Sequence, residues 1–487
     1  MSDINKIGWR FDNTYANLPE SMLSKQEPIP VKSPKIVILN GNLAAELGLN
    51  FINIDEDTLS SLFSGNLLPN GSEAISQAYA GHQFGHFTIL GDGRAIILGE
   101  HLNKKNKRFD IQFKGSGKTP YSRNGDGRAA LAPMLREYLI SEAMYHLGIP
   151  TTRSLAVVKT GETVIREKPL TGAILTRVAE SHIRVGTFQY ASISKDEDNL
   201  KTILNYSIDR HYPQIKNSKN PAIELLDIVI EKQIKLVTEW MRVGFIHGVM
   251  NTDNMTISGE TIDYGPCAFM DIYNPETVFS SIDHQGRYAY FNQPIITKWN
   301  LARFAESLIP LINENKEKAI SIATERINNF DNKYKIYWFK MMKKKIGLFG
   351  NEPNDEKIIE SLLKWMFVNK ADYTNTFCFL MKENIKDNEI YKNETFLGWQ
   401  KEWQQRLKYN SKSFDESLKM MKEMNPIVIP RNEKVEEALT AANNNGFDKF
   451  NKLLKVLSAP YKNQYGIEDY QETSKNINGK YQTFCGT

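Results

Sequence analysis

One short stretch near the middle of this 487-residue chain restricts the possible fold more than any other. Residues 247–265 read HGVMNTDNMTISGETIDYG and place Asp253, Asn254 and Asp263 close together. Carboxylate and amide oxygens suit Mg²⁺, which needs only one or two carboxylates besides substrate phosphates. In residues 255–262 apolar and polar residues alternate on either side of the sequence SGE. This pattern predicts a tight hairpin that returns Asp263 to the side of Asn254. The alternative is an ordinary polar turn between two strands.

The same stretch resembles the catalytic loop and the D-F-G motif of protein kinases, where an Asn and an Asp hold the metal ions. The letters DYG at Asp263 stand where D-F-G would be, and Asn254 follows His247 by seven residues, the spacing of H-R-D-L-x-x-x-N. Val249 stands where the kinase catalytic Asp belongs, and the nearest acid is Asp253. Compared with the kinase motif, the loop therefore keeps the residues that bind metal, whereas its catalytic base lies at another position or is absent.

Glycines and cations suited to phosphate binding precede this loop. The letters GDGR at residues 91–94 separate two apolar strand patterns, which predicts a hairpin whose backbone N–H groups can approach a phosphate. Arg94 adds a forked cation. The strand predicted at residues 109–114 ends on Lys114, as the kinase V-A-I-K strand ends on its lysine. A plain hairpin and a solvated lysine are the alternatives.

A helix is predicted next, because residues 129–147 have apolar residues at helical spacing. Asp126 and Gly127 lie just before it, where the helix dipole attracts anions. Glu137 on this helix can pair with Lys114, although neighbouring charges on the helix compete for both partners.

Further strand patterns follow at residues 153–158, 163–166, 173–178 and 182–189. The first two are predicted to pair as a hairpin across residues 159–162. Arg177 and Arg184 fall in the last two patterns. Two arginines at an apolar sheet edge can hold a triphosphate, or can form salt bridges with nearby Glu180.

The second half of the chain is mostly helical. Residues 222–244 predict an amphipathic helix that leads directly into His247. Helical patterns also cover residues 301–309, 316–330 and 356–367. A long helix before the metal loop is the order found in the C-lobe of kinases.

Composition narrows the class of protein. Hydrophobic residues are 41% and charged residues 24%, as in globular proteins, and the net charge of +4 gives no broad nucleic-acid footprint. The first residues lack the apolar core of a signal peptide, and no apolar run is long enough for a membrane span. Three cysteines favour a reducing compartment, and no Cys/His spacing resembles a zinc site. We therefore expect a cytoplasmic protein with no membrane or nucleic-acid partner.

Several long runs resemble the selenoprotein O family, also called the YdiU family. They are YAGHQFGHFTILGDGRA, QFKGSGKTPYSRNGDGRAAL, LTRVAESHIRVGTFQ, HGVMNTDNM, DYGPCAFMD, YAYFNQP and the terminal TFCGT. The family has a pseudokinase fold and transfers AMP from ATP to Ser, Thr or Tyr hydroxyls of proteins, and some members also use UTP with manganese.

The resemblance implies an α+β, protein kinase-like two-lobe fold with a β-rich N-lobe, a helical C-lobe and N- and C-terminal extensions. The implied boundaries are residues 1–75 for the N-terminal extension, 76–190 for the N-lobe, 191–310 for the C-lobe with the metal loop, and 311–487 for the helical C-terminal region.

The resemblance also implies roles for single residues. Asp253 matches the proton acceptor, while Asn254 and Asp263 match the Mg²⁺ (or Mn²⁺) ligands, with Asp263 also at the nucleotide. Glu137 matches the helix Glu that orients Lys114. The positions that match nucleotide-binding residues are Gly91, Gly93, Arg94, Lys114, Asp126, Gly127, Arg177 and Arg184.

The chemistry of these residues agrees with AMP transfer. Arg94, Lys114, Arg177 and Arg184 are more cations than a kinase N-lobe uses, and arginines stabilise the charge that develops on leaving pyrophosphate. Two other classes stay open: a kinase-type phosphotransferase with Asp253 as its base, and a catalytically silent ATP-binding pseudokinase scaffold. We expect a monomer that modifies other proteins. The sequence gives neither the identity of these substrate proteins nor the preference of the enzyme between ATP and UTP.

The cysteines allow a redox prediction. Cys267 lies four residues after Asp263, Cys485 lies two residues before the last residue, and Cys378 lies in the apolar run TFCFL and is expected to be buried. In eukaryotic members of the family a selenocysteine occupies the place of Cys485. We predict a transient disulfide between Cys485 and Cys267 that constrains the segment after DYG. The alternative is a core Cys267 and an exposed Cys485.

Overall fold

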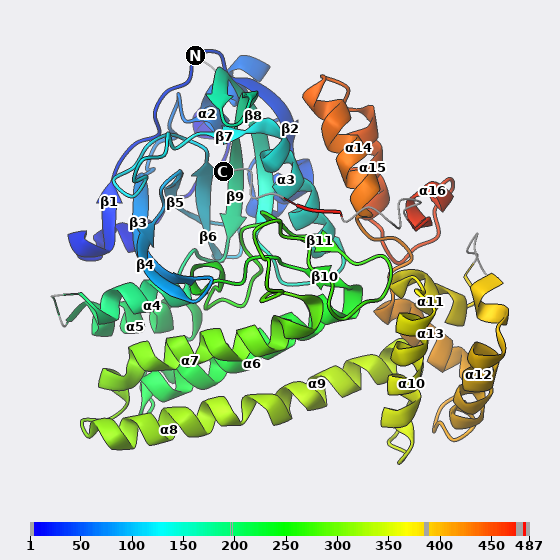
Figure 1. Ribbon diagram of the computed structural model, residues 1–487. Coiled ribbons are helices and arrows are strands. Elements are labelled where there is room, and N and C mark those ends of the chain that lie inside the picture. The colour runs from blue at the N-terminus through cyan, green and yellow to red at the C-terminus, as the bar shows by residue number, and fades with distance from the viewer. Residues whose placement is uncertain (1–3, 195, 197, 384–388, 474–480, 484–487) are drawn as a thin grey trace.

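The computed structural model describes residues 4–483 except positions 195, 197, 384–388 and 474–480. Its centre is a nine-stranded antiparallel sheet in the order β1-β3-β5-β6-β9-β8-β2, with β4 paired to β3 and β7 paired to β9 (Figure 1). The strands are β1 (Leu23–Lys25), β2 (Lys35–Leu39), β3 (Ile75–Gln83), β4 (His86–Gly91), β5 (Ala95–Leu102), β6 (Arg108–Lys114), β7 (Ala129–Ala130), β8 (Arg153–Ile165) and β9 (Pro169–Ala179). Together with the many helices, this sheet confirms the α+β class.

Helices cover both faces of the sheet. Val158 of β8 packs with α1 (Gly41–Leu47) and α2 (Glu56–Ser64), whereas the preceding Val157 packs with α3 (Leu131–His146). Successive residues of a strand point to opposite faces, so each face has its own hydrophobic core. The helix predicted at residues 129–147 is therefore confirmed as α3.

The segment before residue 75 is built into the sheet. It supplies the strands at both ends of the sheet order, β1 and β2. The Asn40 side chain accepts a hydrogen bond from the Leu43 N–H at 3.0 Å and caps α1, which ends at Gly48 with φ of 82°.

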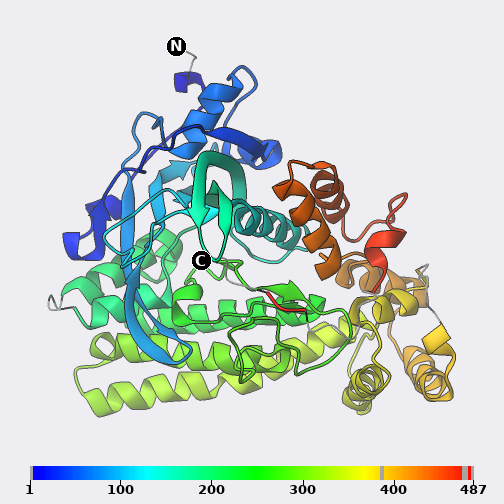
Figure 2. The ribbon, with the colours of Figure 1, turned by 45° about the horizontal axis from the view of Figure 1, so that its top comes forward.

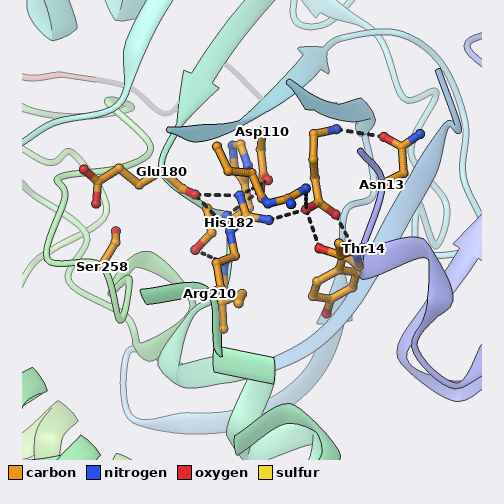
Figure 3. Close-up of polar contacts among 12 residues, drawn as sticks. Asn13, Thr14, Asp110, Glu180, His182, Arg210 and Ser258 are labelled. Carbon is orange, nitrogen blue, oxygen red and sulfur yellow. Dashed lines mark hydrogen bonds and ion pairs between the residues drawn. The ribbon is translucent and has the colours of Figure 1, made fainter. Parts of the chain in front are cut away.

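A buried polar cluster fastens the N-terminal segment to the sheet and to α5 (Asp198–His211) (Figure 3). We call it the sealed network; its members are Thr14, Glu100, Asp110, His182 and Arg210. The Thr14 hydroxyl donates to Glu100 at 2.7 Å, and Arg210 donates to both Glu100 and Asp110 at 2.6 Å. His182 donates its backbone N–H to Asp110 at 2.8 Å, and its Nδ1 lies 3.0 Å from the same oxygen.

The helices between residues 221 and 345 lie below the sheet in Figure 1. α6 (Pro221–Val243) packs against α7 (Gln293–Ile312) and α9 (Phe330–Lys345), and α7 packs against α8 (Lys316–Asn328). The amphipathic helix predicted at residues 222–244 is confirmed as α6. The helices that follow are α10 (Asp355–Val368), α11 (Tyr373–Leu380), α12 (Glu394–Leu407), α13 (Phe414–Met424), α14 (Asn432–Asn443), α15 (Asp448–Leu457) and α16 (Glu468–Gln471). Among the described residues, no helix combines the length and apolar character needed to cross a membrane.

The hairpin predicted across residues 91–94 is wrong. β4 pairs with β3 through a turn at Phe84 and Gly85, whose φ angles are 51° and 90°, and β5 pairs with β3 as well. The GDGR sequence therefore separates β4 from β5, which pair with β3 one after the other along its length. The turn at Phe84 and Gly85 could not be recognised in the sequence, because Phe is an unusual residue at positive φ.

Two further strand predictions are corrected. Residues 153–165 form one strand, β8, in which a register shift between Lys159 and Thr163 absorbs the expected turn as a bulge with Gly161 at φ of 69°. The strand predicted at residues 182–189 is instead the start of α4 (Val185–Ser192), and its apolar residues are buried. A short apolar run does not distinguish a buried strand from a buried helix.

Candidate active site

A cavity of about 710 Å³ lies between the sheet and the loop that contains DYG. All of the predicted site residues line it: Gly91, Gly93, Arg94, Lys114, Asp126, Gly127, Arg177, Arg184, Asp253, Asn254 and Asp263. These residues come from strands, from the start of a helix and from three loops, so the fold gathers them from distant parts of the chain.

The metal loop reverses direction as predicted but does not form a two-stranded hairpin. Thr256 pairs with Arg184 and Thr261 pairs with Thr151, so each arm joins a different outside segment. The reversal is closed by Gly259 at φ of 82° and by the Thr256 hydroxyl, which donates to the Glu260 carbonyl at 2.7 Å. The two arms prefer these outside partners because each arm is buried between them.

Asp263 is the centre of a group of buried charges that we call the cavity network: Lys114, Glu137, Arg177, Arg184 and Asp263. Its Oδ1 lies 2.8 Å from Lys114 Nζ and 2.6 Å from an Arg177 nitrogen, and its Oδ2 lies 3.0 Å from Arg184. Burial alone would raise the pKa of Asp263, but Arg177, Lys114 and Arg184 hold that pKa well below its usual value. The carboxylate is therefore ionised, and it sits at an unfavourable φ of 62° that this environment enforces.

Glu137 on α3 holds two of the cations in place. Its carboxylate lies 2.7 Å from Lys114 Nζ and accepts from Arg177 Nε at 2.8 Å. The competing charges on the helix are engaged elsewhere, since Arg136 pairs with Glu436 and Glu142 pairs with Arg153. The expected pairing of Lys114 with Glu137 is present.

Arg184 joins the cavity network to residues that the sequence analysis missed. Its side chain donates to the Asp253 carbonyl at 2.8 Å, lies 3.7 Å from the Asp92 carboxylate and stacks on the Tyr79 ring at 4.5 Å. Burial raises the pKa of Asp92 to about 6, against the influence of Arg184. The expected salt-bridge partner of the arginines, Glu180, pairs instead with a surface lysine.

Asp253 lies at the bottom of the same cavity. Its side chain is buried, and its Oδ1 has no hydrogen-bond partner among the described residues. Burial raises the pKa of Asp253 to about 6, with Arg184 opposing the shift. A Cβ on Gly81 would lie 2.2 Å from this Oδ1, so only glycine lets β3 pass over the carboxylate. A buried carboxylate oxygen without a donor is poised to accept a proton.

Asn254 and Asp263 are the candidate oxygen ligands for a divalent cation. The Asn254 Nδ2 donates to the Val249 carbonyl at 2.9 Å, which leaves its Oδ1 as the free acceptor. His247 supports the other ligand, since its Nε2 lies 2.9 Å from the carbonyl of Ile262, next to Asp263. Within the described part of the chain, no three His, Cys, Asp or Glu side chains converge on a metal position. The residues therefore fit a cation that shares its coordination with substrate phosphates.

The outer wall of the cavity is a glycine-rich loop. Asp126 forms two hydrogen bonds with Arg166, at 2.8 and 3.0 Å, and these bonds lower the pKa of its carboxyl. Gly127 has φ of 68°, and a Cβ there would lie 2.1 Å from the backbone of Gly117. No side chain therefore fits at Gly127, and the backbone itself forms this part of the cavity wall.

The cysteine predictions have separate outcomes. Cys378 is fully buried, as expected, and burial raises its pKa to about 12. Cys267 is also buried. Cys485 lies outside the described residues, so its disulfide with Cys267 stays a prediction. Thr483 marks where the described chain ends, and its hydroxyl donates to the Pro266 carbonyl at 2.6 Å.

Comparison with known proteins identifies sequence relatives over almost the whole chain. The sequence matches the profile described as "Protein adenylyltransferase SelO" over residues 6–458. A Pelagibacter ubique protein named protein nucleotidyltransferase YdiU is 59% identical over 481 residues, which cover 99% of this chain and 100% of the relative. Relatives with the same name from Nitrosococcus oceani and Bacillus cereus are 58% identical over 482 residues and 55% identical over 488 residues. These alignments cover 99% and 100% of this chain, and 98% and 100% of the two relatives.

Proposed function

The chain belongs to the SelO family of protein adenylyltransferases, and from this we propose that its cavity binds ATP with a divalent cation and transfers AMP to a hydroxyl of a protein. Protein nucleotidyl transfer is the activity of the family. The finer parts of the proposal are Mg²⁺ or Mn²⁺ as the cation, UTP as a second nucleotide, and Ser, Thr or Tyr as the acceptor. A cytoplasmic location, expected from the composition, and a monomeric state are further parts of the proposal.

The proposal includes a protein kinase-like two-lobe fold, with residues 76–190 as N-lobe and 191–310 as C-lobe, flanked by an N-terminal extension (1–75) and a helical C-terminal region (311–487). Its support is local geometry. Lys114 on a strand lies 2.7 Å from Glu137 on a helix and 2.8 Å from the aspartate of the DYG letters. Kinases place the equivalent Lys, Glu and Asp together to hold nucleotide and metal.

One observation carries the functional proposal: a single cavity holds a carboxylate surrounded by cations and a second carboxylate with one oxygen that has no hydrogen-bond partner among the described residues. The first, Asp263, contacts Lys114, Arg177 and Arg184. The second is Asp253, whose Oδ1 has no partner among the described residues. A metal–triphosphate complex needs the first group, and proton removal from an acceptor hydroxyl needs the second.

Nucleotide binding would exchange ion-pair partners in the cavity network. The triphosphate would compete for Lys114, Arg177 and Arg184, with Arg94 at the cavity wall as an added cation. Asp263 would then turn its carboxylate to the cation together with Asn254 Oδ1. The cation, when bound, supplies charge neutralisation on the phosphate oxygens.

The transfer step forms one bond and breaks one. The acceptor hydroxyl oxygen bonds to the α-phosphorus, the bond from that phosphorus to the bridging oxygen breaks, and pyrophosphate leaves with the electron pair. The hydroxyl proton passes to the carboxylate of Asp253. With a pKa of about 6 this group is ionised at neutral pH and is still a useful base. The arginines stabilise the charge on pyrophosphate.

The test is incubation of the protein and acceptor proteins with ATP labelled separately at the α- and γ-phosphates. Label in protein from α-labelled ATP and none from γ-labelled ATP is expected. Label from the γ position alone would mean a kinase, and bound ATP with no label from either position would mean a scaffold.

A further inference from the structure

We propose that the outer edge of β4, together with a stack of Arg287, Trp299 and Arg303, binds an extended segment of the protein substrate that carries an acidic side chain. We call the three residues the arginine–tryptophan stack. The inference rests on the proposed function, because it names the kind of polypeptide that presents its hydroxyl to the cavity.

The outer edge of β4 has unpaired backbone groups. Among the described residues β4 pairs only with β3. In the same register the Asp92 N–H donates to the Gln77 carbonyl at 2.9 Å, and the His82 N–H, opposite Phe87, donates away from β4 to Thr252 at 2.7 Å. Gln77 and Asp92 therefore take a hydrogen-bonded position, and His82 and Phe87 a non-bonded one. Bonded and non-bonded pairs alternate along antiparallel strands. The N–H and C=O groups of Phe87 and Ile89 therefore point away from β3, toward the open edge.

This edge lacks the usual protection against pairing with other chains. Edge strands are commonly guarded by Lys, Pro or a bulge. β4 reads HFTILG, without Lys or Pro, and exposes Phe87 by 44% and Ile89 by 59%. An exposed edge with apolar side chains on alternate positions suits the addition of an extended peptide.

The edge leads to the catalytic cavity. Leu90 and Gly91, at the end of β4, line that cavity, and Gly81 of the paired strand lies directly over the Asp253 carboxylate. In Figure 2 the β3–β4 hairpin extends from the sheet down to the helices of the lower half. A peptide along β4 would therefore run beside the cavity and place a nearby hydroxyl within it.

The arginine–tryptophan stack lies at the other end of β4, at the hairpin turn. The guanidinium carbons of Arg287 and Arg303 lie 4.9 and 5.0 Å from the Trp299 ring centroid. A Cβ on Gly85, in the turn, would lie 3.8 Å from the Arg287 guanidinium. Arg303 pairs with Glu306 at 2.5 Å, whereas Arg287 has no carboxylate partner in the described part of the chain.

An unpaired guanidinium fixed by a ring favours a carboxylate ligand, since the charge is oriented and already partly desolvated. The Arg287 guanidinium and the cavity lie at opposite ends of β4, so they are separated by the length of this short strand. With about 3.3 Å for each residue of an extended chain, the acidic side chain should lie about five or six residues from the modified hydroxyl.

The first experiment selects binders from a displayed library of random 12-residue peptides, each with one Ser, Thr or Tyr, against the full protein. Enrichment of Asp and Glu is expected with wild type and with Lys340→Glu, a matched charge reversal at an exposed lysine of α9. Arg287→Glu should abolish that enrichment and weaken the best acidic peptide about tenfold. No acidic enrichment with wild type, or unchanged enrichment with Arg287→Glu, would overturn the proposal.

The second experiment tests the strand geometry with the best acidic peptide, methylated at one backbone nitrogen at a time. Loss of affinity at every second position is expected, because an added strand turns alternate N–H groups toward β4. Equal effects at successive positions would overturn the pairing of the peptide with β4. A protein dimer that the substitution Ile89→Pro dissociates would also overturn it, because the edge would then bind a second copy of this chain. Both experiments measure binding, so a failure of AMP transfer would be seen separately.

Discussion

Two buried ion networks lie at opposite ends of β6, and they differ in how completely their charges are enclosed. In the sealed network Asp110 and Glu100 share Arg210, and both carboxylates are about 4% or less exposed. In the cavity network Lys114 and Arg177 are also buried, at 8% and 2% exposure, but the Asp263 side chain remains 22% exposed. The two networks use the same chemical groups, so residue type alone does not separate a structural network from a functional one.

The difference lies in what is left unsatisfied. The sealed network joins the N-terminal segment, the sheet and α5, and each of its two carboxylates accepts a hydrogen bond from Arg210 and another from Thr14 or His182. The cavity network faces Asp253 and Asp92, whose pKa values are raised by burial to about 6. Such perturbed groups beside an open cavity are typical of functional sites. We expect changes in the cavity network to affect nucleotide transfer, and changes in the sealed network to affect folding.

The largest effect is expected for Asp263→Ala. The change removes the carboxylate that we propose as a ligand of the metal–phosphate complex, and we expect the rate of AMP transfer to fall by about 10³-fold or more. Metal-dependent ATP binding should be lost in calorimetry, while thermal unfolding stays cooperative because Glu137 still pairs with Lys114 and Arg177. Wild-type ATP binding and turnover in this variant would remove Asp263 from the site.

Asp253→Asn separates chemistry from binding within the same cavity. The amide keeps the shape of the side chain but cannot accept the hydroxyl proton, so the rate should fall by about 10²–10⁴-fold. ATP affinity should match wild type, because Asp253 contacts Arg184 through its backbone carbonyl. A full rate in this variant would show that another group is the base.

Arg210→Met tests the sealed network. Methionine fills part of the space but leaves Glu100 and Asp110 buried without their shared cation. We expect the free energy of unfolding in denaturant to fall by about 3–5 kcal/mol. ATP affinity of the folded protein should be unchanged, and a variant with normal stability and weak ATP binding would reverse the assignment of the two networks.

Local sequence signals predicted part of the cavity network. Lys114 ends a predicted strand and Asp263 belongs to a recognisable loop, so each could be placed by its own neighbourhood. The helix of Glu137 was predicted, but the pairing of Glu137 with Lys114 rested on the resemblance to kinases. Arg184 was placed in a strand but lies at the start of α4. Nothing in the letters near Asp92 indicates that its carboxylate meets Arg184, because that contact depends on how the GDGR segment follows β3.

The sealed network could not be predicted, and the reason is physical. Thr14, Glu100, Asp110, His182 and Arg210 come from five separate segments, and each is an ordinary polar residue in its own segment. Their burial results from the docking of the N-terminal segment and α5 on the sheet. Long-range burial of single charges leaves no periodic pattern in a sequence, in contrast to amphipathic helices such as α6.

The smallest expected effect is a pH dependence of stability that belongs to the sealed network alone. Burial lowers the pKa of His182 to about 4, against the favourable contact with Asp110. The unfolded chain, with an ordinary histidine pKa of about 6.5, therefore binds more protons than the folded protein between pH 6.5 and 4. The contribution of this group to stability is present above pH 6.5 and is lost as the pH falls through that window.

For His182 the loss should be about 2 kcal/mol between pH 7 and pH 5. His182→Gln keeps a neutral donor beside Asp110 and removes the titration, so its unfolding free energy should fall less steeply over this range than that of wild type. His211, whose pKa burial lowers to about 3, remains in both proteins and cancels from the difference. Denaturant unfolding at pH 7, 6 and 5 measures the two slopes. Equal slopes would show that His182 takes up its proton in the folded protein at the same pH as in the unfolded chain, and its pKa would then not be lowered by burial.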